Sequence, residues 1–126
     1  MTRDEFDSLC GTLPGTTHVV QWGGASVWKV GGKIFAICGP WGDGTHQKIS
    51  FKCSRFSYEI LTQQTGIVPA PYLARAEWVQ VQAPDALTDD ELRAYIEQAH
   101  GIIAAKLSKS LRLSLGLTNA GERTAP

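Results

Sequence analysis

Two glycine pairs divide the first half of the chain into short apolar segments, and this pattern constrains the fold more than any other feature. Gly23-Gly24 and Gly31-Gly32 each separate two runs of strand-like composition. Loops of two glycines are typical of the tight turns between antiparallel strands, because these turns need positive φ angles. We therefore predict strands at 19–22, 25–30, 33–38 and 48–53, the first three forming an antiparallel meander.

The two-residue loops also predict which residues lie opposite each other on neighbouring strands. Trp28 is expected to face Phe35 and Val19, and Ser26 is expected to face Ile37. This register gathers Val19, Trp28, Phe35 and Ile37 on one face of the sheet. We expect this face to be the core, because Trp and Phe remove the largest apolar areas from water.

Two capping boxes predict where helices begin. Thr2 with Glu5 opens a first helix that ends before Pro14. Thr88 with Glu91 opens a long helix whose apolar residues recur at helical spacing. These pairs fit helix starts because each side chain can hydrogen-bond the backbone N–H of the other residue.

The remaining segments complete an α+β pattern. Ser54 is expected to cap a helix that buries Phe56, Ile60 and Leu61, and the prolines at 69 and 71 argue against regular structure around them. Alternation at 78–82 predicts a fifth strand. The leucines from 111 to 117 fit either a strand or a short terminal helix.

Length and charge bound the possible partners. At 126 residues the chain has room for one domain, placed at 1–118, with a polar tail at 119–126 expected to be disordered. Twelve basic and twelve acidic residues give zero net charge, so no overall field attracts nucleic acid or an anionic membrane. Residues 18–82 nevertheless carry six bases and three acids. An anion-binding surface must therefore be local.

The cysteines and the N-terminal residues predict a compartment. Cys10, Cys38 and Cys53 lie in apolar surroundings without C-x-x-C spacing, so we expect buried, reduced thiols. The first residues do not form a signal peptide, and no apolar run approaches the ~18 residues of a membrane span. We therefore place the protein in the cytoplasm, without a membrane partner and with a monomer favoured.

The fourth strand carries the main candidates for phosphate contact. Ile49 and Phe51 alternate with Lys48 and Lys52, which we expect on the solvent side. Such lysines are either solubilising guards of a strand or contacts to nucleic-acid phosphates. Under the second interpretation the binding residues are Lys29, Lys48, Lys52 and Arg55, with Arg75, Lys106, Lys109 and Arg112 as secondary candidates.

Two tryptophans are candidate contacts to another partner. Trp41 lies in the glycine-rich connection 39–47 and either folds back over the sheet edge or stays exposed. Trp22 lies at the first predicted hairpin. We name both residues as possible sites of protein or small-ligand binding.

Motifs for catalysis are lacking. The three histidines have no ligand spacing, and no nucleophile elbow, zinc-protease motif or phosphate-binding loop is present. We therefore expect no catalytic residues, no metal and no cofactor.

Several segments resemble the MmcQ/YjbR family of small bacterial proteins. The matching segments are Trp28 to Ala36, Ile49 to Cys53, Ile67 to Leu73 with Trp78-Val79, and Ala105 to Leu117. The resemblance implies a two-layer α+β fold similar to that of CyaY, the bacterial frataxin, and a DNA-binding role without catalytic residues. The family pattern has a proline near Ser108 that this sequence lacks, and that proline favours a terminal helix after a break.

These observations predict a single-domain α+β protein in which an antiparallel sheet of about five strands packs on helices. The leading hypothesis is a non-enzymatic DNA-binding module that uses a basic sheet face and glycine-rich hairpin loops. A protein-interaction or small-ligand module with no nucleic-acid role is the alternative. For an enzyme, the sequence offers no candidate pair of titratable groups.

Overall fold

The structure, a computed structural model, describes residues 1–40 and 47–117. It contains a six-stranded antiparallel sheet of order β1-β2-β3-β4-β6-β5. The strands are β1 Thr16–Gln21, β2 Ala25–Val30, β3 Lys33–Gly39, β4 Lys48–Lys52, β5 Ile67–Pro69 and β6 Trp78–Val81. Trp41 and the predicted tail at 119–126 lie outside the described residues. The predicted α+β class, a sheet packed on helices, is confirmed.

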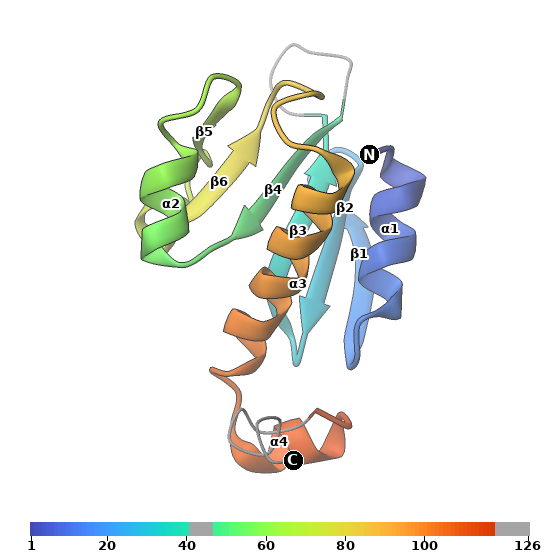
Figure 1. Cartoon of the computed structure of the whole chain (residues 1–126). Coiled ribbons are helices and arrows are strands. Elements are labelled where there is room, and N and C mark those ends of the chain that lie inside the picture. The colour runs from blue at the N-terminus through green and yellow to red at the C-terminus, as the bar shows by residue number, and fades with distance from the viewer. Residues whose placement is uncertain (41–46, 118–126) are drawn as a thin grey trace.

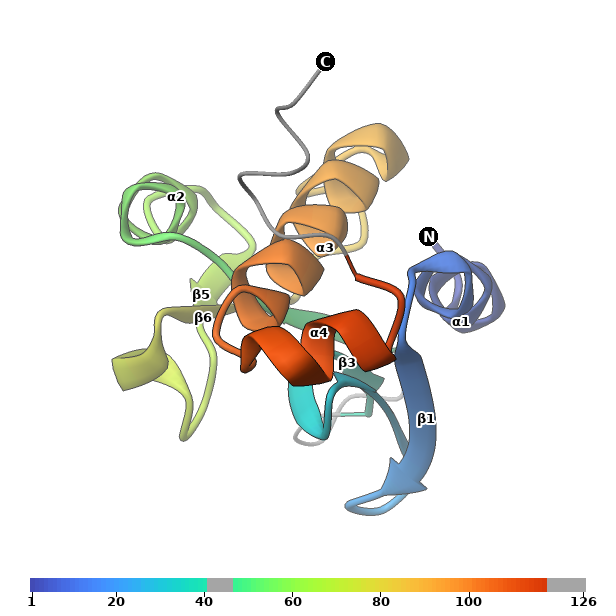
Figure 2. The same ribbon diagram turned by 90° about the horizontal axis from the view of Figure 1, so that it is seen from below.

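The helices are α1 Arg3–Thr12, α2 Arg55–Leu61, α3 Asp89–Ala104 and α4 Lys109–Ser114, with a short 3-10 helix, η1, at Ala74–Ala76. Viewed along the strands, α1, α2 and α3 lie on one side of the sheet, and α4 crosses its lower end (Figure 2). Both predicted capping boxes are present, at Thr2 and at Thr88. Ser108 caps α4, so the leucine-rich segment begins as a helix and not as a strand.

The main core lies between the sheet and the helices. Its largest completely buried side chains are Phe6 from α1, Phe35 and Phe51 from the sheet, and Ile96 from α3. A second, smaller apolar cluster on the opposite face contains Ala25, Val27, Ile37, Ala70 and Trp78. The sheet therefore buries apolar residues on both faces, although the helices cover only one of them.

The second predicted hairpin forms, but a β-bulge changes its register. Gly31 and Gly32 both have positive φ, and Val30 pairs with Lys33 as expected. The register then shifts, so that Trp28 pairs with Ala36 and not with Phe35. A bulge adds one residue to one strand and moves the following side chains to the other face.

Because of the bulge, the residues predicted to share the core face lie on two different faces of the sheet. Trp28 and Phe35 both belong to the core on the helix side, whereas Ile37 packs in the second cluster. Ser26 pairs with Cys38 and not with Ile37. Val19 is 37% exposed at the sheet edge and is not part of either cluster.

The first hairpin has a three-residue loop, because Gln21 pairs with Ala25 across Trp22, Gly23 and Gly24. All three loop residues have positive φ, including 53° at Trp22. The prediction of a two-residue loop was wrong because it placed Trp22 in the strand. As a result, His18 and not Val19 lies opposite Trp28.

Two further predictions were wrong about α2 and β5. Phe56 and Ile60 are 74% and 44% exposed, because the short α2 buries Ser57 and Leu61 and packs the half-buried Tyr58 against the core instead. Pro69 ends a strand, although prolines were expected to exclude one. A proline is tolerated there because β5 is an edge strand, and proline lacks only the N–H group, which the outer side of an edge strand does not use for strand pairing.

No helix among the described residues is long and apolar enough to cross a membrane.

Candidate nucleic-acid interface

Lys52, expected on the solvent side, is buried. Its side chain is on the face of β4 away from the helices, and its Nζ donates a hydrogen bond to the carbonyl oxygen of Ala76. The same Nζ lies 3.6 Å from a carboxylate oxygen of Glu77. The prediction of an exposed Lys52 was wrong because the chain around η1 covers this part of the sheet. Lys52 thereby ties β4 to the end of η1 through its contacts with Ala76 and Glu77.

Two other predicted cations also have partners within the chain. Arg55 is exposed, but it forms ion pairs with Glu59 at 3.3 Å and Glu77 at 3.8 Å. Arg112 donates through Nη1 to the carbonyl oxygen of Ala105, the C-cap of α3, at 3.3 Å and to that of Leu107 at 2.5 Å. A guanidinium suits this place because the last carbonyl groups of a helix lack partners within the helix.

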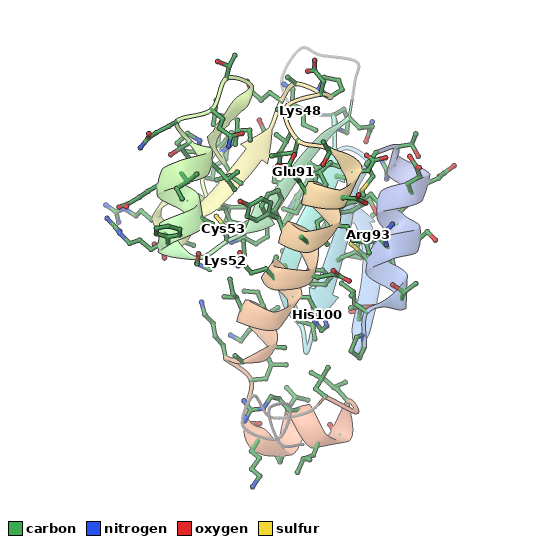
Figure 3. All side chains as sticks on the ribbon, viewed as in Figure 1. Lys48, Lys52, Cys53, Glu91, Arg93 and His100 are labelled. Atoms are coloured by element: carbon green, nitrogen blue, oxygen red, sulfur yellow. The ribbon has the colours of Figure 1, made fainter. Side chains whose placement is uncertain are left out.

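The predicted residues do not form one continuous surface. Lys48 and Lys52 lie at opposite ends of β4 (Figure 3). Arg75 is exposed in η1, at the opposite side of the sheet from β1. Lys48, Lys52 and Arg55 therefore do not form a single basic face.

A different group of lysines does come together at the lower end of the sheet. We call this group the basic end and define it as Lys29, Lys33, Lys106 and Lys109. Lys33 follows the glycine turn between β2 and β3, and Lys29 lies on the last part of β2. The turn adjoins the chain before α4, because a Cβ atom on Gly31 would lie 2.5 Å from Leu107 Cδ1.

Three members of the basic end were predicted, and Lys33 was missed. Its position directly after a predicted glycine turn was the available signal, because the residue next to a tight turn projects at a sheet end. Lys33, Lys106 and Lys109 are exposed, and Lys29 is half-buried.

The basic end is free of carboxylates from its own segments. Residues 8–40 and 98–117 contain no Asp or Glu. The opposite end of the molecule carries Asp4 and Glu5 in the first turn of α1, and three acids, Asp89, Asp90 and Glu91, in the first turn of α3. Both helices begin at this upper end (Figure 1). The upper end also carries the cations Arg3 and Lys48, but the five acids of the two helix starts outnumber them.

The acidic side chains at the upper end are explained by helix capping. Glu5 Oε1 accepts a hydrogen bond from the Thr2 backbone at 2.8 Å, and this bond lowers the pKa of Glu5. Carboxylates in a first helical turn are also favoured by the helix dipole. The acidic end therefore needs no ligand to account for it.

A polar cluster joins α1 to the first hairpin. Ser26 Oγ donates to Asp7 Oδ1 at 2.5 Å and lies 2.7 Å from His18 Nε2. Trp28 Nε1 donates to the same carboxylate oxygen at 2.8 Å. Ser26 is completely buried, so a substrate cannot reach its hydroxyl. The cluster is therefore a tether between α1 and β2 and not a nucleophilic site, although it contains a serine, a histidine and an aspartate.

The described residues offer little else for catalysis. A groove of about 240 Å³ lies between α1 and α3 and is lined by residues that include Glu5, Ser8, Asp89 and Arg93. Among residues 1–40 and 47–117, no three His, Cys, Asp or Glu side chains gather closely enough to hold a metal ion. His100 is buried and bonds the carbonyl oxygen of Pro14 at 2.8 Å, which connects α3 to the start of the first hairpin.

Of the two candidate tryptophans, the structure describes Trp22. Its side chain is 58% exposed at the end of the first hairpin. Trp41 lies outside the described residues.

Two solved structures of bacterial proteins have a similar fold. The crystal structure of Deinococcus radiodurans protein DR2400, whose family-model domain is DUF419, matches with a TM-score of 0.79 at 23% identity, over 99% of this chain and 95% of that one. A Pseudomonas syringae protein, structural-genomics target PsR293, matches with a TM-score of 0.65 at 21% identity, over 82% of this chain and 99% of that one. No curated protein matches the chain.

The fold and the site therefore define a small α+β protein with an open antiparallel sheet and a basic end. The YjbR family model matches residues 11–102. The chain belongs to the YjbR family.

Proposed function

We propose that this YjbR protein binds nucleic acid weakly and without sequence preference, through phosphate contacts made by the basic end. The observation that carries the proposal is that Lys29, Lys33, Lys106 and Lys109 come from separate segments to one end of the molecule, within segments that lack acids. Lysines that meet without neighbouring carboxylates form a local positive potential even when the net charge is zero.

The chemistry of these residues limits the affinity and the specificity. Each lysine is a point charge that can contact one phosphate, whereas base recognition usually uses bidentate side chains such as Arg, Asn or Gln in a groove. Contacts to about four phosphates support affinities of about 10⁻⁴ to 10⁻⁶ M at physiological salt. The proposed binding therefore does not distinguish one DNA sequence from another.

Binding of a generic DNA duplex, titrated with salt, tests the proposal. Because each phosphate contact releases counterions, reversing charge in Lys33→Glu/Lys109→Glu should weaken binding to all sequences alike and reduce the salt slope by about two. The control variant, Arg75→Glu/Arg93→Glu, has the same net charge but leaves the basic end intact. It should lose much less affinity than the first variant.

Two results would contradict the proposal. The first is that wild-type protein shows no salt-dependent retention of DNA at low ionic strength, and the second is that both variants lose the same affinity. Either result would leave the protein-binding alternative, for which exposed Trp22 is the described candidate.

A further inference from the structure

The edge strand β1 lacks the features that usually prevent edge strands from pairing. It is one of the two outer strands, so among residues 1–40 and 47–117 no strand pairs with the outer side of its backbone. Its six residues include no proline and no charged Lys, Arg, Asp or Glu. Natural proteins protect such edges with charges, prolines, bulges or very short strands.

The opposite edge shows what protection looks like in this protein. There β5 has only three residues and ends in Pro69. β1 is twice as long, and it extends away from α1 in the view along the strands (Figure 2). The two edges therefore differ in protection, and β1 is the unprotected one.

Apolar side chains are exposed along β1 and beyond its end. Val19 and Val20 are 37% and 55% exposed, and Trp22 follows with 58%. Trp22 also has a φ of 53°, which is unfavourable for a residue other than glycine, and it lies in the loop of the first hairpin. Exposed aromatic and β-branched side chains beside a free strand edge are typical of an interface.

We propose that β1 pairs with β1 of a second copy of this chain, in an antiparallel arrangement around a two-fold axis, to give one continuous sheet across a homodimer. A two-fold axis places the same strand on both sides of the interface. Because β1 carries no Lys, Arg, Asp or Glu, no register of this pairing puts such like charges opposite each other. Threonine and valine, which make up four of its six residues, pack well across strands.

The polarity of charge favours a second copy over an unrelated peptide. Antiparallel pairing of β1 reverses the direction of the second copy. Its basic end then lies at the same level along the strands as the acidic first turn of α1, the helix that contacts β1 and β2, in the first copy, and the reverse holds for the other two ends. The attraction acts over about one Debye length, roughly 8–10 Å at physiological salt, so it should weaken as salt is added.

Sedimentation equilibrium of the full chain over a concentration series tests the dimer. Wild-type protein should rise from the monomer mass of 13.7 kDa toward twice that value as concentration increases, and high salt should weaken the association. Val20→Lys places a cation on the edge strand and should weaken association at least tenfold. The control Ile60→Lys also adds a lysine at an exposed apolar position, but on α2, and should associate like the wild type.

A second measurement keeps the proposal testable if Val20→Lys fails to fold. Hydrogen exchange of wild-type protein should show slower exchange in Thr16–Gln21 at high than at low concentration, with β5 unchanged. A wild-type protein that stays monomeric to millimolar concentration overturns the proposal. Equal association of the two lysine variants, or concentration-independent exchange in β1, overturns it as well.

Discussion

Trp28 combines more types of contact than any other aromatic residue described above. It is 9% exposed in the main core, its indole N–H bonds Asp7 at 2.8 Å, and its ring stacks on His18 with centroids 4.6 Å apart. Trp28→Ala should destabilise the protein by about 3–5 kcal/mol, because the change leaves a cavity and removes a buried hydrogen bond.

Urea unfolding followed by circular dichroism measures this change. Trp22→Ala is the control, because that side chain is exposed, and its effect should stay within about 0.5 kcal/mol. A Trp28→Ala midpoint close to the wild-type value would show that Trp28 does not contribute to the core as described.

The cysteines connect stability to alkaline pH. Cys38 and Cys53 are buried free thiols, as predicted, and burial raises the pKa of each from 9.0 to about 11. Above pH 9 the thiols ionise in the unfolded chain but remain protonated in the folded one. The unfolded state then loses protons first, so stability should fall between pH 9 and 11, by about 2 kcal/mol per thiol.

Unfolding free energies at pH 8 and pH 10.5 check this expectation. Other groups also titrate in this range, so the useful quantity is the difference between wild type and Cys38→Ala/Cys53→Ala. The double variant should lose less stability than wild type over the same interval. An equal loss in both proteins would mean that these thiols do not cause the fall in stability at alkaline pH.

Lys52 shows why single residues are hard to place from sequence. Alternation correctly puts Lys52 on the opposite face of β4 from Phe51. Whether that face meets water depends on η1, which follows more than twenty residues later and whose covering role has no local signal. Periodicity therefore predicts the face of a residue, but a distant segment determines its burial.

Among the elements, the β2–β3 turn is connected to the C-terminal part of the chain. A Cβ atom on Gly31 would lie 2.5 Å from Leu107, whereas none of the neighbours of Gly23 would be within 4 Å of its Cβ. Both glycines have positive φ. Gly31→Ala should therefore destabilise the protein by about 1–3 kcal/mol more than Gly23→Ala, because only Gly31→Ala adds a steric clash in a buried region.

A double-mutant cycle with Leu107→Ala tests the cause. If the clash with Leu107 is responsible, Gly31→Ala should cost less in the Leu107→Ala background than in wild type. Identical costs in the two backgrounds would attribute the effect to the backbone alone.

At this scale the sequence predicts much of the fold. The capping boxes at Thr2 and Thr88 and the Gly31-Gly32 turn are local patterns, and each occurs as expected. The bulge after Trp28 and the three-residue first loop were missed, because a one-residue change in pairing reverses the faces without changing the alternation that reveals a strand. Strand positions were thus predictable, whereas register was not.

At the scale of the whole molecule, the sheet and helices were predictable and the candidate interface was only partly so. The run of basic residues indicated which segments carry positive charge. It did not indicate that Lys33 and Lys109 share one end while Lys48 lies at the other, because that depends on how β3, β4 and α4 are placed. Spatial grouping follows from topology, which charge counts along the chain do not contain.

The separation of charge between the two ends has a consequence for how the protein behaves on charged surfaces. A molecule with zero net charge whose basic end lies opposite two acidic helix starts can present either end to its surroundings. At neutral pH it should therefore adsorb to both cation and anion exchangers at low ionic strength, lying with opposite ends toward the two resins. Its isoelectric point of about 6.8 describes the sum of its charges but not the side on which the protein meets its surroundings.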